Sequence, residues 1–172
     1  MTDAFEDPIG GRATVGLAAG QWARRVVMAV LALVALAALA NRFGQHPVTS
    51  SAAGPAASLS VLAPEHVRGG LFFESRVDVR AARAITRPRL ILGDGWVDGM
   101  QVNSIEPAPS SEASRDGHVV LSWNELAAGD VLRVWFQFEV DPTNVGRRDY
   151  ALELDDGDTP LARVARTLTV LP

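Results

Sequence analysis

The sequence predicts an all-β antiparallel sandwich of seven to eight strands, preceded by one N-terminal transmembrane helix. Three observations support this fold class. A run of 15 apolar residues lies near the N-terminus, segments of alternating polar and apolar residues fill the chain after residue 58, and Asp-Gly turn signals separate them. No helical period follows residue 43, and a small barrel is the alternative architecture.

The apolar run, Val26 to Ala40, predicts a transmembrane helix over residues 24–43. Its length is slightly below the roughly 20 residues that span a bilayer, so a buried helix of a soluble core is one alternative. Arg24 and Arg25 precede the run, which places the N-terminus in the cytoplasm by the positive-inside rule. Residues 1–23 are therefore expected to be a cytoplasmic segment.

A cleaved signal peptide is a second alternative, because Ala38-Leu39-Ala40 fits the small-x-small cleavage pattern. The preceding segment is long and carries three acidic residues, unlike the compact basic start of a signal peptide, which favours an uncleaved signal anchor in the cell membrane. The sequence leaves cleavage open. Both interpretations place the rest of the chain outside the cytoplasm.

Residues 44–57 are rich in Ser, Ala, Gly and Pro and have no hydrophobic period, which predicts a flexible tether. Residues 58–172 then form the extracytoplasmic domain. In Val131 to Val140 the apolar residues alternate with Arg133, Trp135 and Gln137, so one face of that strand belongs to the core. The expected strands are 59–62, 71–84, 89–92, 101–105, 118–123, 131–140, 150–154 and 162–170.

Two stretches, PRLILGDGWVDGMQVNSIEPAP and DGHVVLSWNELAAGDVLRVWFQFEV, resemble the immunoglobulin-like sandwich of bacterial cell-surface repeat domains. The resemblance covers Arg89 to about Val140. It implies an immunoglobulin-like fold and an extracytoplasmic setting, and it carries over no catalytic residues. One such domain replaces the tandem array of that family, so the resemblance does not extend to a long adhesive stalk.

Composition limits the chemistry. The chain has no cysteine, hence no disulfide or thiolate metal site, and all 16 of its cationic Lys and Arg positions are arginine. A net charge of −4 argues against nucleic-acid binding. The histidines are isolated from any nucleophile motif, so the protein is predicted not to be an enzyme and to need no cofactor or catalytic metal. An unrecognised enzyme remains the third alternative.

Arg76 and Arg80 are candidate interaction residues, because strand alternation points them outward while Val77 and Val79 point inward. Such a face either is neutralised by neighbouring acids or contacts an anionic partner. Trp96, between the Asp-Gly pairs of GDGWVDG, is the third candidate. Turn chemistry predicts a sharp corner there, and an exposed Trp beside Asp and Asn alternatively suits carbohydrate.

The stretch LDDGDTP places Asp155, Asp156 and Asp158 in one predicted hairpin. Carboxylates suit calcium, but the spacing differs from the usual calcium loop, so a tight turn and a calcium site both stay open. Together these features predict a non-catalytic binding or assembly module anchored in the membrane, with an envelope or membrane protein as partner. A carbohydrate or wall-polymer binding domain is the alternative function.

Overall fold

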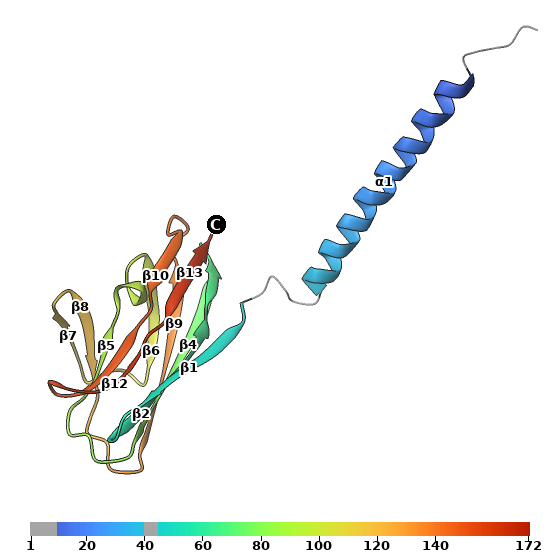
Figure 1. Cartoon of the computed structure of the whole chain (residues 1–172). Coiled ribbons are helices and arrows are strands. Elements are labelled where there is room, and N and C mark those ends of the chain that lie inside the picture. The colour runs from blue at the N-terminus through green and yellow to red at the C-terminus, as the bar shows by residue number, and fades with distance from the viewer. Residues whose placement is uncertain (1–9, 40–44) are drawn as a thin grey trace, which may run out of the picture. The chain divides into compact units, whose positions relative to one another are not determined.

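The computed structural model describes residues 10–39 and 45–172, which form two separate units (Figure 1). The first unit contains the helix α1, Gly10–Leu39. The second unit is a β-domain that starts at Gln45. The β-domain therefore begins before residue 58, the boundary that composition predicts.

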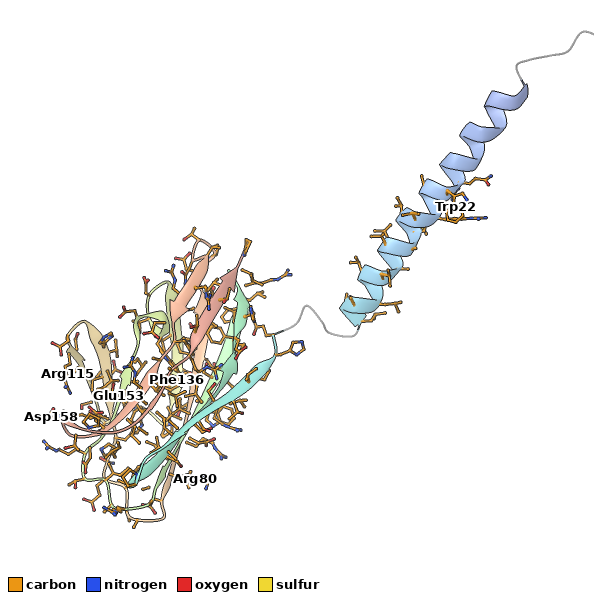
Figure 2. All side chains as sticks on the ribbon, viewed as in Figure 1. Trp22, Arg80, Arg115, Phe136, Glu153 and Asp158 are labelled. Carbon is orange, nitrogen blue, oxygen red and sulfur yellow. The ribbon has the colours of Figure 1, made fainter. Side chains whose placement is uncertain are left out.

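The helix α1 contains the described part of the predicted transmembrane segment. Its part Gly20–Leu39 is 20 residues long and is apolar enough to cross a membrane. None of these residues is buried, whereas the core helix of a soluble domain would bury its apolar face. Trp22 projects from the helix (Figure 2). The predicted span 24–43 coincides with α1 as far as Leu39, and residues 40–43 lie outside the described residues.

Three sheets make up the β-domain. The first sheet has five strands in the order β1-β2-β4-β9-β6. Its strands are β1 Pro47–Ala53, β2 Ala57–Pro64, β4 Phe72–Ala81, β9 Val131–Val140 and β6 Met100–Glu106. The second sheet also has five, in the order β12-β11-β5-β8-β7. Its strands are β12 Thr159–Val164, β11 Leu152–Asp156, β5 Pro88–Leu92, β8 His118–Ser122 and β7 Ser111–Arg115.

The third sheet joins β10 Gly146–Asp149, β13 Thr167–Leu171 and β3 His66–Arg68 in the order β10-β13-β3. The described residues thus contain thirteen strands, not the seven to eight that the sequence predicts. The additional strands are short or polar, so hydrophobic alternation does not reveal them. The β13–β3 pair is parallel, so the expectation of a purely antiparallel domain is wrong at this one pair.

The core is formed by buried side chains from all three sheets, among them Phe136 of β9, Leu154 of β11 and Leu168 of β13, in the packed layers of a β-sandwich. In β9 the side chains of Val134, Phe136 and Phe138 are fully buried, which confirms the predicted alternation of this strand. Tyr150 lies beside them, and its hydroxyl forms a hydrogen bond of 2.9 Å with the buried Ser75 hydroxyl. Burial raises the pKa of Tyr150 far above its ordinary value, so this phenol stays protonated.

The predicted tether contains a strand. β1 pairs with β2 in antiparallel register from Pro47 opposite Pro64 to Ala53 opposite Ser58. Small polar residues such as Thr49 and Ser50 occupy it, and they suit an edge strand that contributes backbone hydrogen bonds rather than core side chains. The prediction of a flexible tether over 44–57 is therefore wrong from Pro47 onward, and residue 44 lies outside the described residues.

The predicted last strand, 162–170, is two strands. β12 ends at Val164 and β13 begins at Thr167, so the chain changes sheets at Ala165 and Arg166. Arg166 is buried at this break and donates to the carbonyl oxygens of Val61 and Ala63 in β2. It also donates to the Val48 carbonyl and the Ser50 hydroxyl of β1. A guanidinium with several donors thus satisfies backbone groups where strand pairing changes.

Candidate interaction surface on the first sheet

The outer face of the first sheet carries the arginines that the sequence singles out. In β4, Val77 and Val79 are fully buried, whereas Arg76 is half-buried and Arg80 is exposed. The predicted outward orientation of both arginines is therefore confirmed. We call the outward side chains of β2, β4 and β9 the Arg76 face; its members are Ser58, Ser60, Leu62, Phe72, Glu74, Arg76, Asp78, Arg80, Val131, Arg133, Trp135, Gln137 and Glu139.

An aromatic ring from the neighbouring strand β9 and a carboxylate from β4 itself lie beside Arg76. Arg76 pairs with Trp135 of β9 and with Leu62 of β2. Its guanidinium carbon lies 5.4 Å from the centre of the Trp135 ring, within the range of a cation–π contact. Its Nε lies 3.2 Å from one carboxylate oxygen of Asp78, as an ion pair without hydrogen-bond geometry, and the other oxygen accepts a hydrogen bond from Arg133. Arg76 is therefore held in place by its neighbours.

Arg80 differs from Arg76 in its surroundings. Its neighbours in register are Ser58 of β2 and Val131 of β9, neither of which is acidic. Figure 2 shows Arg80 projecting from the β-domain. An exposed arginine without an acidic cross-strand neighbour keeps its fork of N–H donors available to a carboxylate or phosphate of a partner.

A shallow groove borders Arg76 and Trp135. Its volume is about 230 Å³, and its lining residues are Gln45, Pro47, Leu62, Pro64, Glu74, Arg76 and Trp135. The alternation of β9 places Trp135 outward, but the sequence does not reveal that Trp135 pairs with Arg76. Cross-strand register, which depends on the folded topology, assembles this part of the surface.

Trp96 is not on the surface. It belongs to the 3₁₀ turn η1, Asp94–Trp96, and its side chain is fully buried. The indole N–H donates to the Ala151 carbonyl at 2.9 Å, and the ring stacks on Tyr150 with 4.0 Å between centroids. The carbohydrate hypothesis, which requires an exposed Trp96, is therefore wrong for this residue.

Close packing explains the glycines beside Trp96. A Cβ added to Gly95 would lie 2.5 Å from the Asp149 carbonyl oxygen, so only glycine lets the two segments approach. Gly99 has φ +67°, and its added Cβ would meet the side chain of Asn144. GDGWVDG is thus a corner, as turn chemistry predicts, and it inserts the tryptophan into the core, which turn chemistry does not predict.

No family model matches the chain, and no curated protein matches it.

The acidic hairpin between β11 and β12 faces arginines. Arg89 contacts the Asp158 carboxylate at 3.1 Å, and Arg115 lies 3.7 Å from Asp155 and 3.6 Å from Asp158. Figure 2 shows Arg115 and Asp158 beside each other. Burial, and next the nearby Glu153, raise the pKa of Asp155, while Arg115 and Arg89 oppose the rise. Within residues 10–39 and 45–172, no group of three or more acidic or histidine side chains could hold a metal ion.

A larger polar groove of about 550 Å³ lies elsewhere, between the β3 and β10 edges of the third sheet and Arg166. Its lining residues include Glu65, His66, Arg147 and Asp149. Arg166 contributes to its wall, but the guanidinium already donates to three backbone carbonyls and one hydroxyl. The sequence does not indicate this groove, because its residues come from segments that are far apart along the chain.

Proposed function

We propose that this protein is a single-pass membrane protein whose C-terminal domain is a non-catalytic, extracytoplasmic binding or assembly module with an immunoglobulin-like fold. The helix α1 would act as an uncleaved signal anchor. Arg24 and Arg25, ahead of the apolar segment, support a cytoplasmic N-terminus. The partner would be a protein of the envelope or of the same membrane.

One observation carries the binding proposal. The Arg76 face combines Arg76, held between Trp135 and Asp78, with Arg80, which lacks an acidic cross-strand neighbour. Aromatic side chains and arginine are the residue types enriched at protein interfaces. Since Arg80 has spare donors and Arg76 is preorganised, the surface suits an acidic patch on a partner protein.

The test is photo-cross-linking in cells from a photoactivatable residue placed at Gln137, which is exposed on the same face of β9. Arg76→Ala combined with Arg80→Ala should reduce the cross-linked partner several-fold. The matched control is Arg147→Ala combined with Arg163→Ala, which removes the same charge from exposed positions on other strands. That control should leave the cross-link unchanged.

Stability and salt complete this test. The Arg76/Arg80 variant should unfold within about 1 kcal/mol of the wild type, because exposed substitutions and a surface cation–π contact have small effects. Raising the salt concentration should weaken the wild-type contact, since exposed charges are screened over about 8 Å at physiological ionic strength. An unchanged cross-link in the Arg76/Arg80 variant would exclude this face as the binding site.

A further inference from the structure

Exposed apolar side chains gather at one end of the β-domain. Leu71 and Phe72 are 46% and 65% exposed, and Val145 and Leu171 are 49% and 40% exposed. The backbone links them: Gly69 N–H donates to the Leu171 carbonyl, and Gly146, next to Val145, pairs with Val170. We call these four residues the apolar tip. In Figure 1 the C-terminus marks this end of β13.

The tip is rigid. Gly70 N–H donates to the Val140 carbonyl at 2.8 Å, and Val140 N–H donates to the Leu71 carbonyl at 3.1 Å. An added Cβ on Gly69 would lie 2.9 Å from the Pro142 carbonyl oxygen, so this turn packs tightly on the segment after β9. The exposure of Leu71 and Phe72 therefore comes from a fixed turn and not from a frayed chain end.

The chain enters the β-domain beside this tip. The Gln45 side chain donates a long hydrogen bond of 3.4 Å to the Phe72 carbonyl, and Pro47 pairs with Pro64, just ahead of β3. Gln45 is six residues after Leu39, the last helical residue of α1. Even a fully extended chain of that length spans only about 20 Å. If α1 crosses a bilayer, the tip is thus restricted to the neighbourhood of the bilayer surface.

We propose that the apolar tip inserts into the interfacial region of the bilayer that α1 crosses, so that the β-domain contacts the membrane through Leu71 and Phe72. This inference rests on the proposed membrane anchoring. Aromatic and leucine side chains enter the boundary between headgroups and acyl chains. Exposed charges near the tip have both signs, Arg68 against Glu74 and Asp141. Apolar contact, and not attraction to anionic lipid, therefore drives the insertion.

Spin labelling of the full chain in vesicles tests the proposal. The chain has no cysteine, so single-cysteine variants carry one label each. Leu71→Cys reports the tip. Val131→Cys is the matched control, because Val131 is 44% exposed and pairs with Arg80 at the opposite end of β4. Leu33→Cys reports whether α1 lies in lipid.

The Leu71 label should show a several-fold higher ratio of oxygen to water-soluble nickel-chelate accessibility than the Val131 label. The ratio should be the same in phosphatidylcholine vesicles and in vesicles that also contain phosphatidylglycerol. Adding Phe72→Ser should shift the Leu71 label towards the aqueous value, whereas Phe72→Leu should retain it.

The outcomes separate the two proposals. A Leu71 label as aqueous as the Val131 label, with the Leu33 label in lipid, overturns tip insertion and leaves the anchor intact. An aqueous Leu33 label overturns the anchor, and tip insertion falls with it. Dipolar broadening between Leu71 labels on two chains would show that a second copy covers the tip, which also overturns insertion.

Discussion

Arg166 shows how one residue can bond two strands, β1 and β2, from a break between two others. Its guanidinium bonds backbone carbonyls of β1 and β2 from the break between β12 and β13. Arg166→Met keeps the aliphatic bulk but leaves the Val61 and Ala63 carbonyls without this donor. We expect the free energy of unfolding to fall by about 2 to 4 kcal/mol, because buried acceptors lose their partners. Urea denaturation of the full chain measures this loss.

Arg163→Met is the control for this prediction, since Arg163 is exposed in β12. It should change the free energy of unfolding by no more than about 0.5 kcal/mol. Arg166→Lys should recover only part of the stability, because an ammonium lacks the planar set of donors. Equal stability of Arg166→Met and Arg163→Met would contradict the clamping role.

The raised pKa of Asp155 should make the free energy of unfolding depend on pH. Burial raises its pKa above the ordinary value of 3.8. Between the unfolded and folded pKa values the folded chain binds more protons than the unfolded chain, so stability falls as pH rises through that window. Asp155→Asn cannot ionise, and it should escape this loss. As pH rises from about 4, the unfolding midpoint of the wild type should therefore fall relative to that of the variant.

Asp116→Asn provides the comparison, because Asp116 is a turn residue with an exposed side chain. This variant removes one carboxylate beside Arg115, as Asp155→Asn does, and so controls for the loss of a negative charge there. Parallel pH profiles for the wild type and Asp155→Asn would show that Asp155 has no raised pKa. Arg115→Gln should enlarge the effect, since Arg115 opposes the rise in the pKa of Asp155.

At the scale of residues, the sequence predicts which way a side chain points better than it predicts which residues surround that side chain. Alternation alone predicts that Arg76 and Arg80 point outward, and they do. It does not distinguish the held Arg76 from the less constrained Arg80, because that difference depends on which residues of β2 and β9 lie opposite. Trp96 could be recognised as part of a corner, but its burial depends on Tyr150 and Ala151, which are more than fifty residues away.

At the scale of elements, we predict that the strand β1 contributes to the stability of the β-domain. Replacing Pro47–Ala53 by a Gly-Ser sequence of equal length keeps the connection but weakens pairing with β2 and removes the Ser50 hydroxyl that Arg166 bonds. We expect a lower thermal unfolding midpoint, since the flexible replacement costs more entropy to order. Differential scanning calorimetry measures it.

The same replacement at the exposed turn Ala82–Ala84 is the control, and it should shift the midpoint less. If 47–53 were a tether, its replacement would leave the midpoint unchanged. That result would support the prediction from composition and contradict the paired strand.

A strand is easier to predict from the sequence when more of its side chains are buried. β9 alternates over its whole length because one face is core, so its bounds are predicted correctly. β1 has no fully buried residue and therefore no hydrophobic signal. β12 and β13 look like one strand, because the apolar pattern continues past the break and a buried arginine does not mark a break in advance.

At the scale of the whole molecule, the proposed anchor predicts an intact N-terminus. The segment ahead of Arg24 is long and acidic, and positive charge lies ahead of the apolar part, so signal peptidase should leave the chain uncut. Mass spectrometry of the membrane-extracted protein should find peptides from Arg12 to Arg24. A mature chain that begins at Asn41 would instead indicate a soluble exported domain.

The pairing of β1 with β2 also determines how the domain would respond to mechanical tension. A partner bound near Arg80 and an anchor attached at Gln45 would pull on opposite ends of the first sheet, along its strands. Tension in that direction shears the β1–β2 pairs together and does not unzip them one at a time. Arg166 donates hydrogen bonds to both β1 and β2, and these bonds would also have to break before the two strands could slide past each other. The strand β1, which composition predicts to be part of a flexible tether, would thus transmit force from the anchor to the β-domain.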